Sequence, residues 1–134
     1  MLDTVSAFGH DRWVPDPARP VALRSVAPVF STRDVGLWLQ HYRTLGFTVE
    51  AHGDEYGFAQ MGSVVLHVSR NAGHDPLTTA GCAYVDVEDA AAVWRVWSAV
   101  PGGRDVEPVE TDYGLSEGAH VDPDGNLLRY GSRR

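Results

Sequence analysis

The chain has 134 residues and a formal net charge of −7. Its mass of 14.6 kDa fits one domain that can bury roughly two-thirds of its unfolded surface. All 11 basic residues are arginine, and the acidic balance disfavours nucleic acid as a partner and favours a cationic small molecule. No apolar run approaches the roughly 20 residues of a membrane span, and the single cysteine, Cys82, excludes an internal disulfide and a multi-cysteine zinc site. We therefore expect a cytoplasmic protein with no membrane partner.

The first 20 residues differ in composition from the rest of the chain. They show no sustained hydrophobic period and contain four residues that interrupt regular structure: Gly9, Pro15, Pro17 and Pro20. We therefore expect an extended N-terminal arm over residues 1–20 and a single domain over residues 21–134.

The first part of this domain, about residues 21–70, has the pattern of a strand, a helix and three further strands. The β-rich run over residues 21–30 predicts the first strand. Apolar residues recur at helical spacing over residues 35–45, with Asp34 placed to cap the helix and Gly46 placed to end it. The segments FTVEAH, YGFAQM and VVLHVS alternate as three short strands.

The second part, about residues 80–131, repeats this order. The segment GCAYVDV predicts a strand, and a helix follows that begins near Glu88 and Asp89 and ends before Pro101-Gly102-Gly103. Three more strands are predicted near residues 106–110, 118–121 and 127–130.

The two parts align without a gap through strand and helix when Ala27 is set against Cys82, and Asp34 then falls on Asp89. The matched punctuation and apolar period indicate a duplication. The sequence thus predicts an α+β fold of two βαβββ modules that form a curved mixed sheet, whose concave face can form a pocket.

The residues outside this pattern offer no catalytic constellation. The chain has no GxSxG motif, no phosphate-binding glycine loop and no HxH or HExxH spacing. The adjacent carboxylates Glu88 and Asp89 are better explained as charges in the first turn of a helix. No mechanism for an enzyme follows from these residues.

Several segments together resemble a known family over about residues 22–131. They are VAPVFSTRDV with WLQHYRTLGF, then VVLHVSRN, HDPL at residues 74–77 and VDPDGNLLRYG at residues 121–131. The chain resembles the bleomycin-resistance proteins of the glyoxalase/bleomycin resistance/dioxygenase (vicinal oxygen chelate) superfamily. DPDGN is shared across that superfamily, and the DPL loop and the LLRYG strand end narrow the resemblance to the resistance branch.

The resemblance also identifies the four positions that hold a metal in metal-using relatives: Ala27, His67, Cys82 and Arg129. Ala27 has no donor atom and Arg129 is a fixed cation, so the resemblance implies a vacated metal site, no cofactor and no metal-dependent reaction. We expect His67 to be a hydrogen-bonded structural residue and Cys82 a small buried hydrophobe. A metal-dependent glyoxalase or dioxygenase, or a member that binds another small molecule, remains as the alternative.

In the resistance proteins that the chain resembles, a homodimer sequesters planar, cationic glycopeptide antibiotics in grooves between its subunits. The resemblance places the groove aromatics on Tyr56 and Tyr113, where tryptophan is common in the family. Pro28 falls where the N-terminal strand crosses to the partner, which implies a strand-exchanged homodimer. Antibiotic resistance by binding of bleomycin, without catalysis, is the implied function.

The other candidate groove residues flank these tyrosines. They are the wall residues Phe30 and Phe58, the acidic residues Asp54, Glu55, Asp112 and Glu117, and His67. The helical spacing of Trp38 and Tyr42 places both in the core between helix and sheet.

Overall fold

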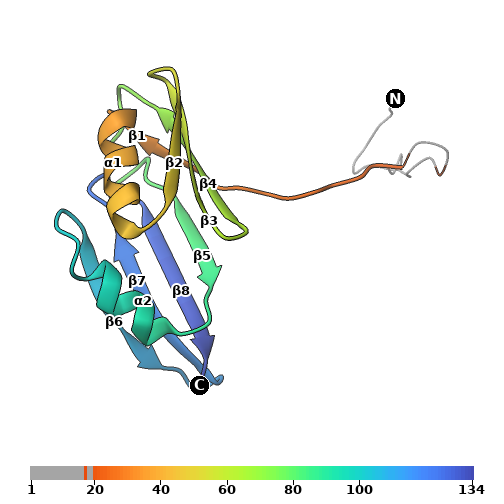
Figure 1. The fold of residues 1–134 in the computed structure, drawn as a ribbon, viewed down its shortest axis with the longest axis vertical. Coiled ribbons are helices and arrows are strands. Elements are labelled where there is room, and N and C mark those ends of the chain that lie inside the picture. The colour runs from red at the N-terminus through yellow and green to blue at the C-terminus, as the bar shows by residue number, and fades with distance from the viewer. Residues whose placement is uncertain (1–16, 18–19) are drawn as a thin grey trace.

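Two copies of one strand and helix arrangement make up the molecule (Figure 1). The computed structural model describes residue 17 and residues 20–134, so the arm expected over residues 1–20 lies almost entirely outside the described residues. The first module contains β1 (Val29–Thr32), α1 (Val35–Leu45), β2 (Thr48–His52), β3 (Tyr56–Met61) and β4 (Val64–Arg70). The second contains β5 (Cys82–Asp86), α2 (Ala90–Trp97), β6 (Arg104–Glu110), β7 (Leu115–Val121) and β8 (Leu127–Arg133).

Each module forms its own four-stranded mixed sheet. The strand orders are β1-β4-β3-β2 and β5-β8-β7-β6. In both sheets the first strand pairs in parallel with the last strand of its module, and the remaining pairs are antiparallel. The predicted α+β class and the βαβββ repeat are therefore confirmed, with two sheets in place of one continuous sheet.

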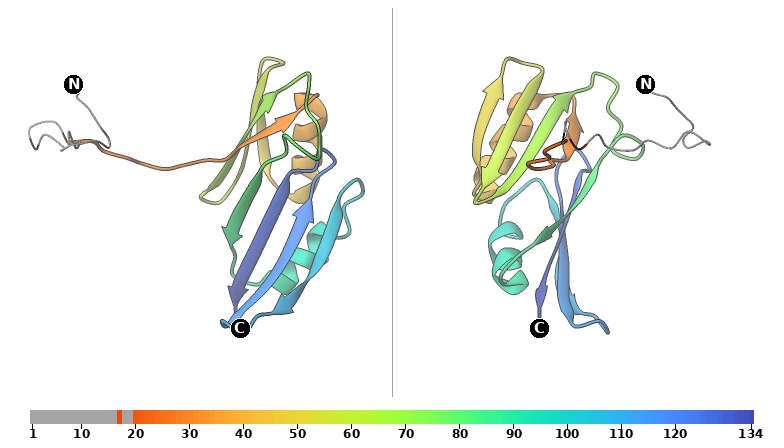
Figure 2. Two further views of the ribbon diagram at one scale, coloured as in Figure 1. Left: turned by 180° about the vertical axis from the view of Figure 1, so that it is seen from behind. Right: turned by 90° about the vertical axis from the view of Figure 1, so that its right-hand side faces the viewer.

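Each helix covers one face of its sheet and leaves the other face open. Figure 2 shows the open face of the second sheet in its left view and that of the first sheet in its right view, with the helix behind the strands in each. The two sheets are turned relative to one another. Neither helix in the described part of the chain is long and apolar enough to cross a membrane.

The helices begin where the sequence predicts. Asp34 accepts a hydrogen bond from the Leu37 amide at 3.0 Å, and Asp89 accepts one from the Ala91 amide at 3.0 Å. These carboxylates satisfy amides that have no partner inside the helix. Gly46, with φ of 112°, ends α1 in the left-handed region that suits glycine. The second helix stops at Trp97, several residues before the predicted Pro101.

Strand boundaries depart from the sequence prediction mainly in the first strand. β1 begins at Val29, so residues 21–28, including Ala27 and Pro28, precede it. Parallel pairing with β4 starts only at the pair Val29 and His67. Residues 20–28 do not belong to this strand and leave the domain as an extended segment (Figure 1). In the other module, β7 begins at Leu115, three residues earlier than expected.

The core lies between the helices and the sheets. Trp38 and Tyr42 are 1% and 0% exposed and stack with ring centroids 4.0 Å apart, which confirms their predicted place. Phe30 packs against both rings and is 1% exposed. Successive residues of a strand point to opposite faces, and β1 directs Phe30 toward the helix.

The turn over residues 122–126 fastens the second module to the first. The Tyr42 hydroxyl donates to Asp122 at 2.7 Å. The Asn126 amide nitrogen donates to the Ser31 carbonyl at 3.0 Å, and its amide oxygen accepts from the Gly81 backbone at 2.8 Å. The shared DPDGN segment therefore has a structural role, because its buried side chains join elements from both modules.

Candidate ligand-binding site

The open face of the first sheet carries a group of three rings, which we call the first-face cluster: Tyr56, Phe58 and His67. Phe58 and His67 are cross-strand partners on β3 and β4. The Tyr56 hydroxyl lies 2.9 Å from His67 Nδ1, and the ring centroids are 4.8 to 5.5 Å apart with edge-to-face geometry. All three side chains are partly exposed. Such a cluster offers aromatic surface to a planar ligand.

The open face of the second sheet carries a polar and aromatic group, which we call the second-face cluster: Tyr84, Tyr113, Glu117 and Arg129. Tyr84 donates to one Glu117 oxygen at 2.8 Å, and Tyr113 donates to the other. Arg129 lies 3.9 Å from Glu117, and its guanidinium carbon lies 5.8 Å from the centre of the Tyr84 ring. The carboxylate of Glu117 therefore holds both tyrosine hydroxyls.

Glu117 changes the acid-base behaviour of both tyrosines. Its hydrogen bond raises the pKa of Tyr84 to about 12 and raises the pKa of Tyr113 above the ordinary tyrosine value. The hydrogen bonds from Tyr113 and Tyr84 in turn lower the pKa of Glu117. At neutral pH this arrangement is an ionised carboxylate that accepts two hydrogen bonds from neutral phenols.

Two sequence expectations about burial are wrong. Phe30 was expected in the groove wall, yet it is buried on the helix side of β1. Cys82 was expected to be buried, yet it is exposed on the open side of β5. Each error has the same cause, because the alternation of a short apolar strand does not reveal which of its two faces meets the helix.

The four metal-ligand positions do not fit a metal ion. Ala27 lies before β1 and has no donor atom, and Arg129 is a half-exposed guanidinium that repels a cation. His67 and Cys82 lie on different sheets. Within residues 20–134, no group of three or more histidine, cysteine or carboxylate side chains is placed to hold a metal ion.

The predicted acidic residues do not come together. Glu55 pairs with Arg70 at 3.5 Å on the first module, whereas Asp112 is exposed beside Tyr113 on the second. Asp54 lines a groove of about 470 Å³ between the start of α1 and the turn after β2. This groove has charged walls and no aromatic ring in its lining, so it offers no stacking surface to a planar molecule.

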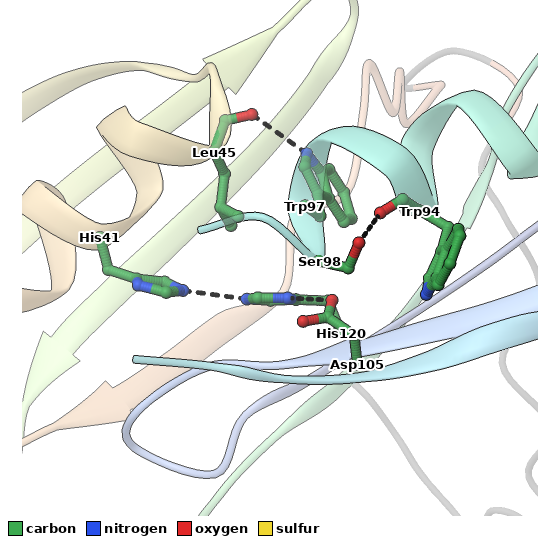
Figure 3. A network of polar contacts seen from close by, with 7 residues as sticks. All are labelled: His41, Leu45, Trp94, Trp97, Ser98, Asp105 and His120. Atoms are coloured by element: carbon green, nitrogen blue, oxygen red, sulfur yellow. Dashed lines mark hydrogen bonds and ion pairs between the residues drawn. The ribbon is translucent and has the colours of Figure 1, made fainter. Parts of the chain in front are cut away.

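A buried polar chain connects the two modules, and the sequence pattern does not predict it (Figure 3). Asp105 contacts His120 Nδ1 at 2.7 Å, and the Nε2 atoms of His120 and His41 lie 2.9 Å apart. Burial and the neighbouring His120 lower the pKa of His41 to about 4. Gly103 is the local sequence signal of this polar chain, because a Cβ at that position would lie 2.5 Å from the His120 ring. The chain links α1 of the first module to β6 and β7 of the second, so it joins the two modules.

Tyr84 was also missed, although the sequence contains a signal for it. A Cβ at Gly131 would overlap the Tyr84 hydroxyl, so the glycine that ends LLRYG leaves the space in which this tyrosine lies. Reading that signal requires the register of β5 against β8, which places Tyr84 beside Arg129 and Asp86 beside Gly131.

The arrangement of two βαβββ modules is the fold of the glyoxalase and bleomycin resistance proteins. The sequence matches no family model and no curated protein. Solved structures nevertheless resemble the chain over most of its length, and together they support the glyoxalase/bleomycin resistance/dioxygenase superfamily.

Three of these structures define the similarity. A bleomycin resistance determinant encoded on the transposon Tn5 is 25% identical, with a TM-score of 0.75 over 84% of this chain and 99% of that one. The bleomycin-binding protein of Streptomyces verticillus, complexed with copper(II)-bleomycin, is 22% identical, with a TM-score of 0.73 over 86% and 100%. A glyoxalase-related enzyme from Clostridium phytofermentans is 17% identical, with a TM-score of 0.73 over 87% and 99%. Binding proteins and enzyme relatives thus share this fold.

Proposed function

We propose that the chain is a non-enzymatic binding protein that sequesters bleomycin-type cationic glycopeptides and so confers antibiotic resistance. The observation that carries this proposal is the chemistry of the open faces. They present rings, Tyr56 and Phe58 on one face and Tyr84 and Tyr113 on the other, and an arginine occupies one of the metal-ligand positions. Exposed aromatic surface beside an arginine at a metal-ligand position suits the binding of a planar ligand.

The charge of the chain supports a cationic ligand. A formal net charge of −7 accelerates the encounter with a cation through long-range attraction. Exposed Asp112 lies beside Tyr113, and Asp54 and Glu55 lie directly before Tyr56. In this proposal the rings hold the planar part of the drug while these three carboxylates attract its cationic groups, and His67 fixes the Tyr56 ring.

The binding unit that we propose is a strand-exchanged homodimer. Residues 20–28 carry Val21, Leu23 and Val26 with 68%, 89% and 94% of their surfaces exposed. β1 pairs with β4 only from His67 onward, so residues 64–66 have no partner on that side within the described chain. Residues 20–28 of a second copy would cover the exposed apolar side chains of this segment and pair with residues 64–66. The second copy would also close the open faces into grooves.

Titration with metal-free and copper-loaded bleomycin tests the function. We expect saturable quenching of tyrosine and tryptophan fluorescence with a dissociation constant of about 1 μM or tighter, because several stacked rings and charge attraction act together. Phe58→Ala should weaken binding by about tenfold. Leu37→Ala, which removes an equally apolar but exposed side chain from the outer side of α1, is the matched control.

Two outcomes would overturn the proposal. One is the absence of any saturable signal with either form of the drug at high micromolar concentration. The other is a divalent metal bound near stoichiometry in the purified protein, as measured by elemental analysis, because it would favour metal-dependent chemistry.

A further inference from the structure

The second-face cluster is more specific than an aromatic patch. We infer that it binds a planar aromatic group that carries an acceptor oxygen, a carboxylate or a carbonyl, with Tyr84 as the stacking residue and Arg129 as the residue that selects the oxygen. This inference deepens the proposed function and rests on it, since it names the chemistry that one face of the groove recognises.

The Tyr84 side chain lies across the sheet. It starts on β5, and its hydroxyl reaches Glu117 on β7 at 2.8 Å, so it crosses β8, which lies between those strands. It passes over Gly131, where any side chain would overlap the hydroxyl. About half of the tyrosine remains exposed, 47% of its surface. A ring held over a strand in this way leaves aromatic surface exposed to a ligand.

Glu117 is a positioning residue for this ring. Only 13% of its side chain is exposed, and its two oxygens accept from the Tyr84 and Tyr113 hydroxyls. Both tyrosines are therefore fixed at their outer ends by one group. Because the carboxylate is occupied by two phenols and faces Arg129, it is a poor acceptor for the cationic part of a ligand.

Arg129 has hydrogen-bonding capacity left for a ligand. Its guanidinium has five N–H donors, and its ion pair with Glu117 is long, at 3.9 Å. Half of its side chain is exposed, 51% of its surface, and its guanidinium carbon lies over the Tyr84 ring, 5.8 Å from the ring centre. A flat ligand that contacts the exposed part of the Tyr84 ring therefore lies next to a cation. An acceptor oxygen beside that cation is favoured and a cationic substituent there is repelled.

A matched pair of small ligands tests this selectivity. The probes are 2-naphthoate and 2-naphthylmethylammonium, which share a ring and differ in the sign of the substituent. We expect naphthoate to bind with a dissociation constant of about 1 mM, and the cation at least about tenfold more weakly, in ligand-detected NMR. Arg129→Gln should abolish the difference in affinity between the two probes, and Tyr84→Ala should weaken naphthoate binding by about tenfold.

The inference is overturned if the cation binds as tightly as naphthoate, if Arg129→Gln keeps the preference, or if neither probe binds at several times the expected concentration. These outcomes are separable from failure of the proposed function, because the bleomycin titration is run on the same proteins. Bleomycin binding without naphthoate selectivity would reject the inference alone.

The positioning role of Glu117 has a spectroscopic signature. We expect Glu117→Gln to lower the pKa of Tyr84 from about 12 toward the ordinary tyrosine value, followed by NMR of tyrosine labelled with carbon-13 at Cζ. Glu110→Gln is the control, because it removes an exposed carboxylate that pairs with Arg134 at 3.1 Å on the same module. An unchanged Tyr84 titration in Glu117→Gln, or an equal shift in the control, would reject the positioning role.

Discussion

Tyr56 and His67 show how a single hydrogen bond can prepare a binding surface. The 2.9 Å contact uses the tyrosine hydroxyl and His67 Nδ1, so the histidine fixes the ring by its polar end while the faces of both rings remain partly exposed. His67 Nε2 makes no hydrogen bond to any described residue. The pair therefore combines a rigid aromatic surface with one nitrogen that a ligand can use.

Substitutions of Tyr56 should separate these two contributions. Tyr56→Phe removes the hydrogen bond but keeps the ring, and we expect a loss of about 1 kcal/mol of unfolding free energy with bleomycin affinity within about threefold of wild type. Tyr56→Ala removes the ring as well and should weaken bleomycin by about tenfold or more. Urea denaturation and fluorescence titration measure the two effects. Equal affinities of the Phe and Ala variants would show that the ring does not contact the ligand.

The family resemblance and the strand pattern of the sequence predict only some of the residues on the open faces. They placed Tyr56, Phe58 and Tyr113, and the structure locates all three side chains at the surface, on or beside the open faces. They misplaced Phe30 because a strand of alternating residues can face the helix in either of two phases. Tyr84 was missed because its neighbours come from β7 and β8, and only the strand register brings them together.

At the scale of elements, the turn over residues 122–126 has the greatest structural consequence. Asn126 is fully buried, and its side chain bonds to backbone groups on two other segments, at Ser31 and Gly81. His74 adds a further contact, with Nε2 2.7 Å from the Asp124 carbonyl. The turn therefore replaces backbone pairing at a place where no strand continues between the modules.

Replacement of Asn126 should lower the unfolding free energy of the protein. Asn126→Ala leaves the Gly81 amide and the Ser31 carbonyl without this partner, and each unsatisfied buried group costs about 1–3 kcal/mol. We expect a loss of about 2–5 kcal/mol in unfolding free energy, measured by urea denaturation. Asn71→Ala is the control, because its exposed side chain makes one local bond to the Gly73 amide at 3.0 Å, and it should cost less than about 1 kcal/mol. Similar losses in both variants would contradict the joining role of the turn.

The elements themselves were largely predictable. Asp34 and Asp89 cap helices as their spacing indicates, because capping depends on residues a few positions apart. The start of β1 was not predictable in this way. Residues 21–28 have strand-forming composition, yet a strand also needs a partner. Within the described chain the ladder with β4 starts at Val29, and of the residues before it only Pro28 has a backbone hydrogen bond to β4, from the His67 amide at 2.9 Å.

At the scale of the whole molecule, the buried chain of Asp105, His120 and His41 makes the junction sensitive to acid. The pKa of His41 is about 4 in the folded chain, against an ordinary value near 6.5. Between about pH 6.5 and pH 4 the unfolded chain therefore takes up a proton that the folded chain does not. The contribution to stability is complete above pH 6.5 and is lost as the pH falls toward 4.

Comparison of wild type with His41→Gln isolates this effect. We expect the unfolding free energy of wild type to fall by about 2 kcal/mol more than that of the variant between about pH 7 and pH 4.5. Burial also raises the pKa values of Asp122 and Asp124, but both proteins retain these groups, so their contributions cancel. His52→Gln, at an exposed site on β2, should follow wild type. Parallel pH curves for wild type and His41→Gln would contradict the prediction.

The assembly of the molecule depends on the segment before β1. Leu23 is 89% exposed on residues 20–28, and Leu77 is 92% exposed in the linker between the modules. If a second copy covers the segment, Leu23→Asp places a charge in an apolar interface and should weaken dimerisation by about tenfold or more, whereas Leu77→Asp should leave it unchanged. Light scattering at micromolar concentration should give twice the 14.6 kDa chain mass for wild type and Leu77→Asp and a lower mass for Leu23→Asp. A monomeric wild type would reject the exchanged dimer and the grooves that depend on it, while leaving the selectivity of the second-face cluster to be decided by the naphthalene probes.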